Sequence, residues 1–295
     1  MRITISGGTG RIGGDLVAKL RARGDEVTLL SRSAERGVRW DLTAEPAPAE
    51  ALSGRDAVIN LAGEDVAQRW SDDVKQRIRD SRVVGTRNLV AGLRALPDAE
   101  RPRVLVSGSA SGYYGPRPSD DLVTEDDAPG SDFLARVCVD WEAEARSAEE
   151  LGVRVARIRT GVVLDRKGGA LAKMLPFFRA GIGGPVAGGR QAMPWISLDD
   201  EVGLLIAALD GDDWSGPFNA GAPAPVTNAE FSKALGRALH RPAIAPVPAF
   251  AIRLLYGEMA SIVTSGVRML PAAATAHGFT FRHPSLDEAL RDAVG

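Results

Sequence analysis

The chain has few of the residues that build disulfides, metal sites and histidine-based active sites. Cys138 is its only cysteine, so an intrachain disulfide is excluded and a reducing compartment is expected. The three histidines, His240, His277 and His283, all lie late in the sequence, and no Cys/His cluster has metal-ligand spacing. The sequence therefore predicts no metal site, and it excludes histidine catalysis from the N-terminal half.

Long apolar runs and a strong net charge are missing too. No apolar run reaches about 18 residues, and the chain enters a strand pattern at once, so we expect neither a membrane span nor a signal peptide. A net charge of −2 gives no electrostatic reason to expect nucleic acid or an acidic membrane as a partner. We therefore expect a cytoplasmic globular protein.

A glycine-rich turn near the N-terminus is the strongest feature that is present. Arg2–Ser6 alternates like a buried strand, and Gly7-Gly8-Thr9-Gly10-Arg11-Ile12-Gly13 follows without a gap. An apolar face at helical spacing comes next, formed by Ile12, Leu16, Val17 and Leu20. Val27–Leu30 is a second strand pattern, so the segment predicts one strand–helix–strand unit.

Each glycine of this turn has a physical role. Gly7 permits a tight turn, Gly10 lets a pyrophosphate approach the backbone, and Gly13 lets the helix pack close to the strand. The free amides at the helix start, aided by the helix dipole, hold phosphates. The context favours dinucleotide binding over a purely structural turn.

The end of the second strand points to the type of dinucleotide. An acidic residue there would bind the ribose of NAD, but none is present before Glu35. Arg32 offers a charge for a 2′-phosphate, with Ser31 and Ser33 as further donors. The alternative is a solvated arginine in a chain with 31 arginines and five lysines. We therefore expect NADP(H) rather than NAD(H).

Later strands place further residues at the same edge of the sheet. Asp41 lies at the end of the strand pattern Val38–Leu42 and either accepts from an adenine amino group or caps the next turn. The strand pattern that starts at Asp56 ends in Leu61, Ala62 and Gly63, whose small side chains leave room for a ribose or diphosphate. Another, Val104–Ser107, runs into a hydroxyl-bearing loop over residues 108–115.

The alternation of strands and helices predicts an α/β protein with a Rossmann-type, doubly wound parallel sheet. We assign residues 1–165 to this domain and expect one or two segments of about 190–220 to return to it. Residues 166–295 form a smaller mixed α/β substrate region, with a small C-terminal domain over 246–295. Two long helical stretches, Ser71–Ala95 and Asp132–Leu151, either pair in a homodimer or are covered within one chain.

Motifs along the whole chain resemble the extended short-chain dehydrogenases/reductases, and most closely their atypical "epimerase family protein" branch with its small C-terminal domain. They include GGTGRIG, VINLAGE, QRWSDDVKQRIRDSR, SGSASGYYG, DFLARVCVDWE and GFTFRHPSLDEAL. The resemblance implies NADP(H) held by Gly7, Gly10, Arg11, Ile12, Gly13, Ser31, Arg32, Leu61, Ala62, Glu64, Arg82 and Val162.

One departure from this superfamily bears on catalysis. Its enzymes use a Tyr-x-x-x-Lys pair in which the tyrosine is the acid/base and the lysine lowers its pKa. Counting back from Glu142 puts Leu134 and Cys138 at these two positions, and no tyrosine here precedes a lysine by four residues. The remaining candidates stand where the superfamily places its catalytic Ser or Thr: Ser109, Ser111, Tyr113 and Tyr114.

Two functions remain open from the sequence. The first is an NADP(H)-dependent oxidoreductase or epimerase-like enzyme, which transfers hydride to or from a small carbonyl or hydroxyl substrate while the 109–114 loop polarises the oxygen. The second is a non-catalytic NADP(H) sensor with a redox-dependent protein partner, which the missing Tyr/Lys pair favours.

Overall fold

The computed structural model describes all 295 residues and is built around a seven-stranded sheet in which every neighbouring pair is parallel. The strand order is β11-β7-β5-β4-β1-β2-β3. The strands are β1 (Arg2–Ser6), β2 (Glu26–Ser31), β3 (Val38–Arg39), β4 (Ala57–Asn60), β5 (Val104–Ala110), β7 (Arg154–Thr160) and β11 (Gly216–Ala220). The predicted Rossmann-type sheet is confirmed, and its order reverses between β1 and β4, where such folds bind ligands.

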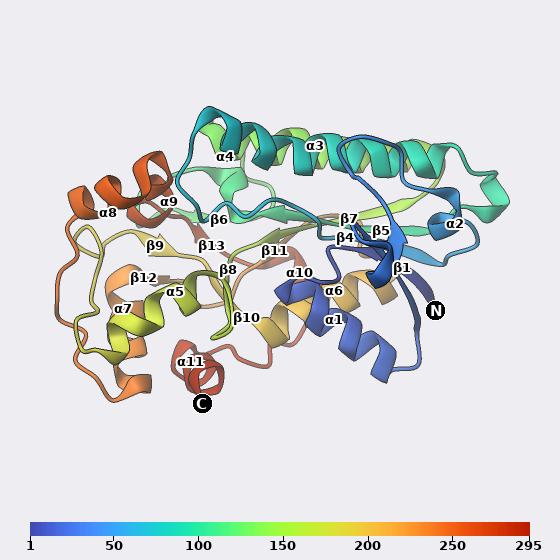
Figure 1. The fold of residues 1–295 in the computed structure, drawn as a ribbon. Coiled ribbons are helices and arrows are strands. Elements are labelled where there is room, and N and C mark those ends of the chain that lie inside the picture. The colour runs from blue at the N-terminus through green and yellow to red at the C-terminus, as the bar shows by residue number, and fades with distance from the viewer.

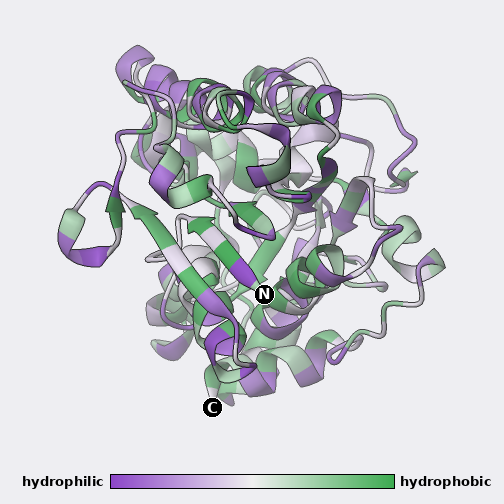
Figure 2. Ribbon diagram, turned by 90° about the vertical axis from the view of Figure 1, so that its right-hand side faces the viewer, coloured by the Kyte–Doolittle hydropathy of each residue, from purple (hydrophilic) through white to green (hydrophobic).

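Helices cover both faces of this sheet, as Figure 1 shows. On one face α3 (Asp72–Arg94) lies beside α4 (Phe133–Arg146), and on the other α1 (Arg11–Ala22) packs against α6 (Leu198–Asp210). The short α2 (Ala49–Leu52) contacts α3. In Figure 2 the strands are largely apolar between helices with polar outer faces. None of the helices has both the length and the apolar character needed to cross a membrane.

The second half of the chain forms a smaller mixed region. Its helices are α5 (Gly169–Arg179), α7 (Asn228–Leu239), α8 (Ala249–Tyr256), α9 (Ala260–Thr264), α10 (Ala272–Ala276) and α11 (Leu286–Val294). Three two-stranded pairs join β8 (Val162–Leu164) to β10 (Trp195–Ser197), β9 (Ala192–Met193) to β12 (Val226–Thr227), and β6 (Leu122–Val123) to β13 (Arg268–Met269). Helices α5, α7 and α11 share one apolar core that includes Phe178 and Phe231.

Some elements differ from the sequence expectation for local reasons. The strand expected over residues 193–197 is divided into β9 and β10 at Pro194, which has no amide hydrogen to donate. The α-helix expected over Asp132–Leu151 ends at Arg146 and continues as a 3₁₀ turn over Ser147–Leu151. Helix α5 lies in the glycine-rich stretch where no helix was predicted.

Candidate functional site

The turn between β1 and α1 lies against the end of β4, at the point where the strand order reverses. Gly7 has a φ of +72°, and a Cβ there would lie 2.6 Å from the carbonyl carbon of Leu61. A Cβ on Gly13 would come within 2.3 Å of the Gly7 carbonyl oxygen. At both positions an added Cβ would collide with backbone atoms, so no residue larger than glycine fits unless the turn shifts.

The first turn of α1 presents free backbone donors. The N-cap residue is Gly10, which has no side chain to accept a hydrogen bond from the first amides, and the first turn contains no acidic residue. The Gly10 amide donates to Gly7 (2.9 Å) and the Gly14 amide to Gly10 (2.8 Å), whereas the amides of Arg11, Ile12 and Gly13 have no protein acceptor. Three unpaired donors at a positive helix end fit a pyrophosphate.

The end of β2 supplies a cation without a counter-ion. Arg32 is exposed and makes no side-chain hydrogen bond or ion pair within the chain. Beside it, the Ser31 hydroxyl accepts from the amide of Ser33 at 3.2 Å. Asp41, by contrast, accepts from the amide of Thr43 (3.1 Å) and from its hydroxyl (3.0 Å), and these hydrogen bonds lower the pKa of Asp41. This carboxylate caps its own turn in the structure.

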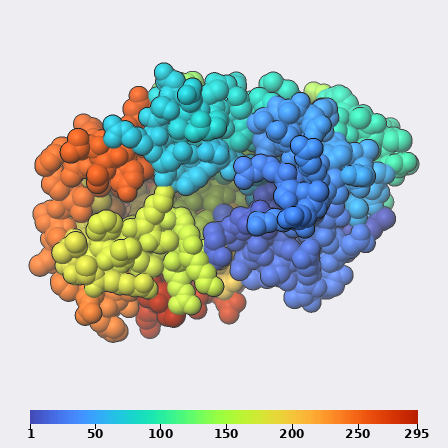
Figure 3. Space-filling model, in the orientation of Figure 1, coloured from blue at the N-terminus to red at the C-terminus, as the bar shows by residue number.

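Arg82 reaches from α3 under the loop that follows β4. Its guanidinium donates to the carbonyl of Glu64 at 3.0 Å and to that of Ile78 at 3.2 Å, and burial lowers its pKa. A Cβ on Gly63 would lie 3.1 Å from the guanidinium carbon, so the Arg82 side chain packs directly against the Gly63–Glu64 backbone. Figure 3 shows a hollow between this loop, the glycine turn and the α5 segment. Val162, at the start of β8, donates its amide to Pro194 at 2.6 Å.

The four hydroxyl candidates of the 109–114 segment divide into two pairs. Ser109 is buried and donates to Glu142 at 2.7 Å. Tyr114 is fully buried, donates to Asn219 at 2.6 Å and accepts from Arg159 at 2.9 Å, and burial raises its pKa to about 12. Ser111 and Tyr113 are half-buried, and their hydroxyls have no protein partner.

A buried ion pair stands behind these hydroxyls, and the sequence interpretation did not single it out. The Arg159 guanidinium binds Glu142 through two hydrogen bonds, of 2.8 and 3.0 Å, with the arginine 2% exposed. It also lies 3.5 Å from the centroid of the Tyr113 ring. The sequence did contain a signal for this pair: Arg159 ends the strand pattern 154–159, and a charge in a buried strand needs a partner of opposite charge.

The positions expected for the Tyr/Lys pair face this same segment. A Cβ on Gly112 would lie 3.3 Å from the Leu134 Cβ and 3.8 Å from the Cys138 sulfur. Burial raises the pKa of the Cys138 thiol to about 12, so it is neutral near pH 7. An apolar side chain and an inert thiol therefore stand where a proton relay would be placed.

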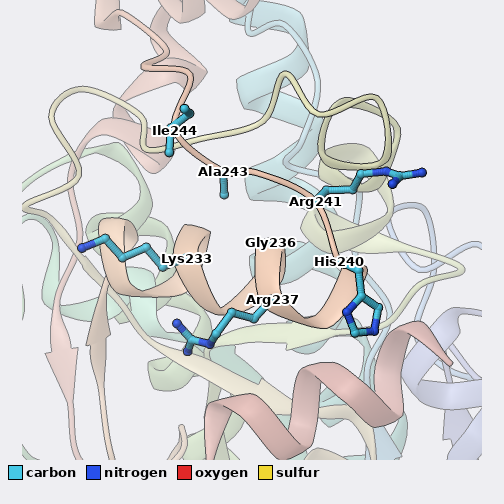
Figure 4. Close-up of a pocket in the computed structure, with 7 residues that line it drawn as sticks. All are labelled: Lys233, Gly236, Arg237, His240, Arg241, Ala243 and Ile244. Atoms are coloured by element: carbon cyan, nitrogen blue, oxygen red, sulfur yellow. The ribbon is translucent and has the colours of Figure 1, made fainter.

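A separate cavity of about 630 Å³ lies between α7 and the segment that follows it. It is lined by Lys233, Gly236, Arg237, His240, Arg241, Ala243 and Ile244. Figure 4 shows that its basic side chains point away from one another. Arg237 is already paired with Asp287 at 2.7 Å. The cavity includes none of the residues expected to bind cofactor, so it is not assigned to that site.

The parallel sheet, its order and the glycine turn define a Rossmann-type protein of the short-chain dehydrogenase/reductase kind. The chain belongs to the NAD dependent epimerase/dehydratase family, whose model matches residues 3–221, and residues 247–293 match a domain of unknown function. The family resemblance expected from the motifs is confirmed.

The relatives agree with this assignment. An epimerase family protein of Mycobacterium bovis is 43% identical over 98% of this chain and 96% of its own length. The crystal structure of human epimerase family protein SDR39U1 (isoform 2) with NADPH has a TM-score of 0.90 at 35% identity, over 99% of each chain. A nucleoside-diphosphate sugar epimerase of Corynebacterium glutamicum has a TM-score of 0.80 at 33% identity, over 100% of this chain and 58% of that chain.

Proposed function

We propose that this chain binds NADP(H) across the carboxyl edge of the sheet. The carrying observation is the set of three unpaired amides at the start of α1, which lies at the reversal of strand order. The unpaired Arg32 at the end of β2 and the NADPH-bound human relative support the choice of NADP(H). The proposed contacts are Gly7, Gly10, Arg11, Ile12, Gly13, Ser31, Arg32, Leu61, Ala62, Gly63, Glu64, Arg82 and Val162, with Asp41 at the adenine end.

Calorimetric titration of NADPH and NADH into the wild type and Arg32→Ala tests this site. A charge-assisted phosphate contact contributes about 1.5–3 kcal/mol, so the variant should bind NADPH roughly ten- to a hundred-fold more weakly and NADH unchanged. Arg36→Ala is the matched control: this exposed arginine lies in the 3₁₀ turn that follows β2, and its removal should leave the affinity for both nucleotides unchanged. Equal binding of both nucleotides by the wild type would remove the 2′-phosphate assignment.

We propose further that the protein is an oxidoreductase or epimerase-like enzyme for a small carbonyl or hydroxyl substrate. The bound cofactor supplies hydride transfer at its nicotinamide. Ser111 and Tyr113 are the hydroxyls without internal partners, so they are assigned to bind and polarise the substrate oxygen, and Tyr113 donates the proton. The hydroxyls of Ser109 and Tyr114 hold the segment in place through Glu142 and Asn219.

A panel of aldehydes, ketones and nucleotide sugars tests the activity: reduction is followed by loss of NADPH fluorescence, and epimerisation, which leaves the cofactor unchanged overall, by identifying the product sugar. For a substrate that is turned over, Tyr113→Phe should lower kcat by about 10²- to 10⁴-fold, the usual contribution of a general acid. Tyr256→Phe, on α8, should leave kcat unchanged. Full activity in Tyr113→Phe would exclude that tyrosine as the proton donor.

A non-catalytic NADP(H) sensor is the second candidate, because Leu134 and Cys138 occupy the positions of the usual proton relay. In that case a protein partner would be captured differently in NADPH and in NADP⁺. Turnover of any substrate, or capture that is the same in both redox states, counts against it.

A further inference from the structure

Arg11 and Asp165 join two segments that lie 154 residues apart in the sequence. Arg11 is the first residue of α1, and Asp165 follows β8 directly. The Arg11 Nε and Asp165 Oδ2 atoms lie 2.5 Å apart. The Arg11 side chain is 49% exposed, whereas that of Asp165 is only 9% exposed. The nearly buried aspartate therefore holds the end of a long, half-exposed arginine side chain. Its other oxygen accepts from the amide of Lys167 at 2.9 Å.

The three unpaired amides of Arg11, Ile12 and Gly13 form what is called here the amide cradle, and the Arg11–Asp165 pair starts from one of its residues. The backbone amide of Arg11 belongs to the cradle, whereas its side chain runs out to the turn between β8 and α5. A Cβ on Gly168 would lie 2.7 Å from the Arg11 Cγ, so this turn packs on the arginine stem. Figure 3 shows the α5 segment facing the N-terminal segment across the hollow.

Helix α5 is tied to the nucleotide-binding half a second time, further along. Lys173 donates to the carbonyl of Ala67 at 2.5 Å and lies 3.9 Å from Asp65. Between the two ties stands Gly169, with a φ of +64°, a conformation that glycine adopts without strain. The segment 165–173 thus spans the cleft from the glycine turn to the loop after β4.

We infer that the Arg11–Asp165 pair is a clasp that closes over the diphosphate of the bound nucleotide and limits its passage. This inference rests on the proposed cofactor site. A pair that closes over the diphosphate must open for the nucleotide to enter as well as to leave. Asp165 is a positioning residue, which acts on the nucleotide only through Arg11 and the turn.

Stopped-flow NADPH fluorescence, with release followed by displacement with excess NADP⁺, tests the clasp in the full-length protein. In Asp165→Asn both the association and the release rate should rise about ten-fold, and Kd should stay within about three-fold. Asp199→Asn is the control: it breaks the 2.5 Å Lys19–Asp199 pair that joins α1 to α6, and both rates should stay at wild-type values.

Unchanged rates in Asp165→Asn would overturn the clasp. So would tighter binding through slower release, because Asp165 would then only compete with phosphate for Arg11. If Asp165→Asn does not fold, Lys173→Met opens the other tie, whose lysine is exposed, and the same rise in both rates is expected. A wild type that binds no NADPH refutes the cofactor site itself, which separates that failure from failure of the clasp.

Discussion

The Arg159 guanidinium forms two hydrogen bonds with Glu142 and stacks 3.5 Å from the centre of the Tyr113 ring. One buried arginine therefore connects β7, α4 and the hydroxyl segment. Because both charged groups are shielded from water, neither is stable there without the other. This pair explains how the segment keeps its shape with Leu134 and Cys138 at the positions of the usual Tyr/Lys pair.

Removing one partner of this pair should destabilise the protein strongly. Glu142→Gln leaves the Arg159 charge buried without a counter-charge, and we expect a loss of about 3–5 kcal/mol in the free energy of unfolding, measured by urea denaturation. Glu150→Gln breaks the exposed Arg94–Glu150 pair and should hardly move the midpoint. Similar losses in the two variants would contradict the role given to the buried pair.

The buried Glu201 should make stability depend on pH. Its Oε1 accepts from Thr160 at 2.8 Å, its Oε2 has no partner, and burial raises its pKa from 4.5 to about 7. The folded protein therefore holds this proton more tightly than the unfolded chain does. The resulting stability is fully present below about pH 4.5 and is lost as the pH rises through about 7.

Glu201→Gln removes that ionisation. At pH 8 the variant should be more stable than the wild type, by up to about 3 kcal/mol, whereas at pH 5 the difference should be much smaller. Urea unfolding at the two pH values measures both. Glu230→Gln should lose stability at pH 8, because hydrogen bonds from Thr227 lower the pKa of Glu230 and favour its charged form. A Glu201→Gln effect that is equal at both pH values would sink the prediction.

Neighbouring glycines of α1 should respond differently to a methyl group. A Cβ on Gly13 meets the Gly7 carbonyl oxygen at 2.3 Å, so Gly13→Ala must displace the turn and should abolish measurable NADPH binding. A Cβ on Gly14 has no atom nearer than 3.9 Å. Gly14→Ala should bind NADPH normally and gain up to about 1 kcal/mol of stability from helix propensity. Calorimetric titration and thermal unfolding of both variants provide the comparison.

Local patterns were enough to predict the Rossmann-type sheet and the glycine turn at 7–13, and they placed Arg32 directly after the second strand. Strand alternation, helix periodicity and glycine positions act over a few neighbouring residues, and the order of strands and helices then favours one parallel architecture. The helix over Leu286–Val294 is predicted with its observed bounds for the same reason. Helix α5 was missed although Leu171, Leu175 and Phe178 have helical spacing, because the surrounding glycines indicated a loop.

The sequence by itself determined the family, the sheet and the free amides of the first turn, because these depend on residues close together in the chain. Only the tertiary structure decided which hydroxyls are free, since Tyr114 is bound by Asn219, 105 residues away. Likewise, nothing in the local sequence pairs Arg11 with Asp165. Burial and ion pairing depend on which distant segments meet, and no local spacing records that.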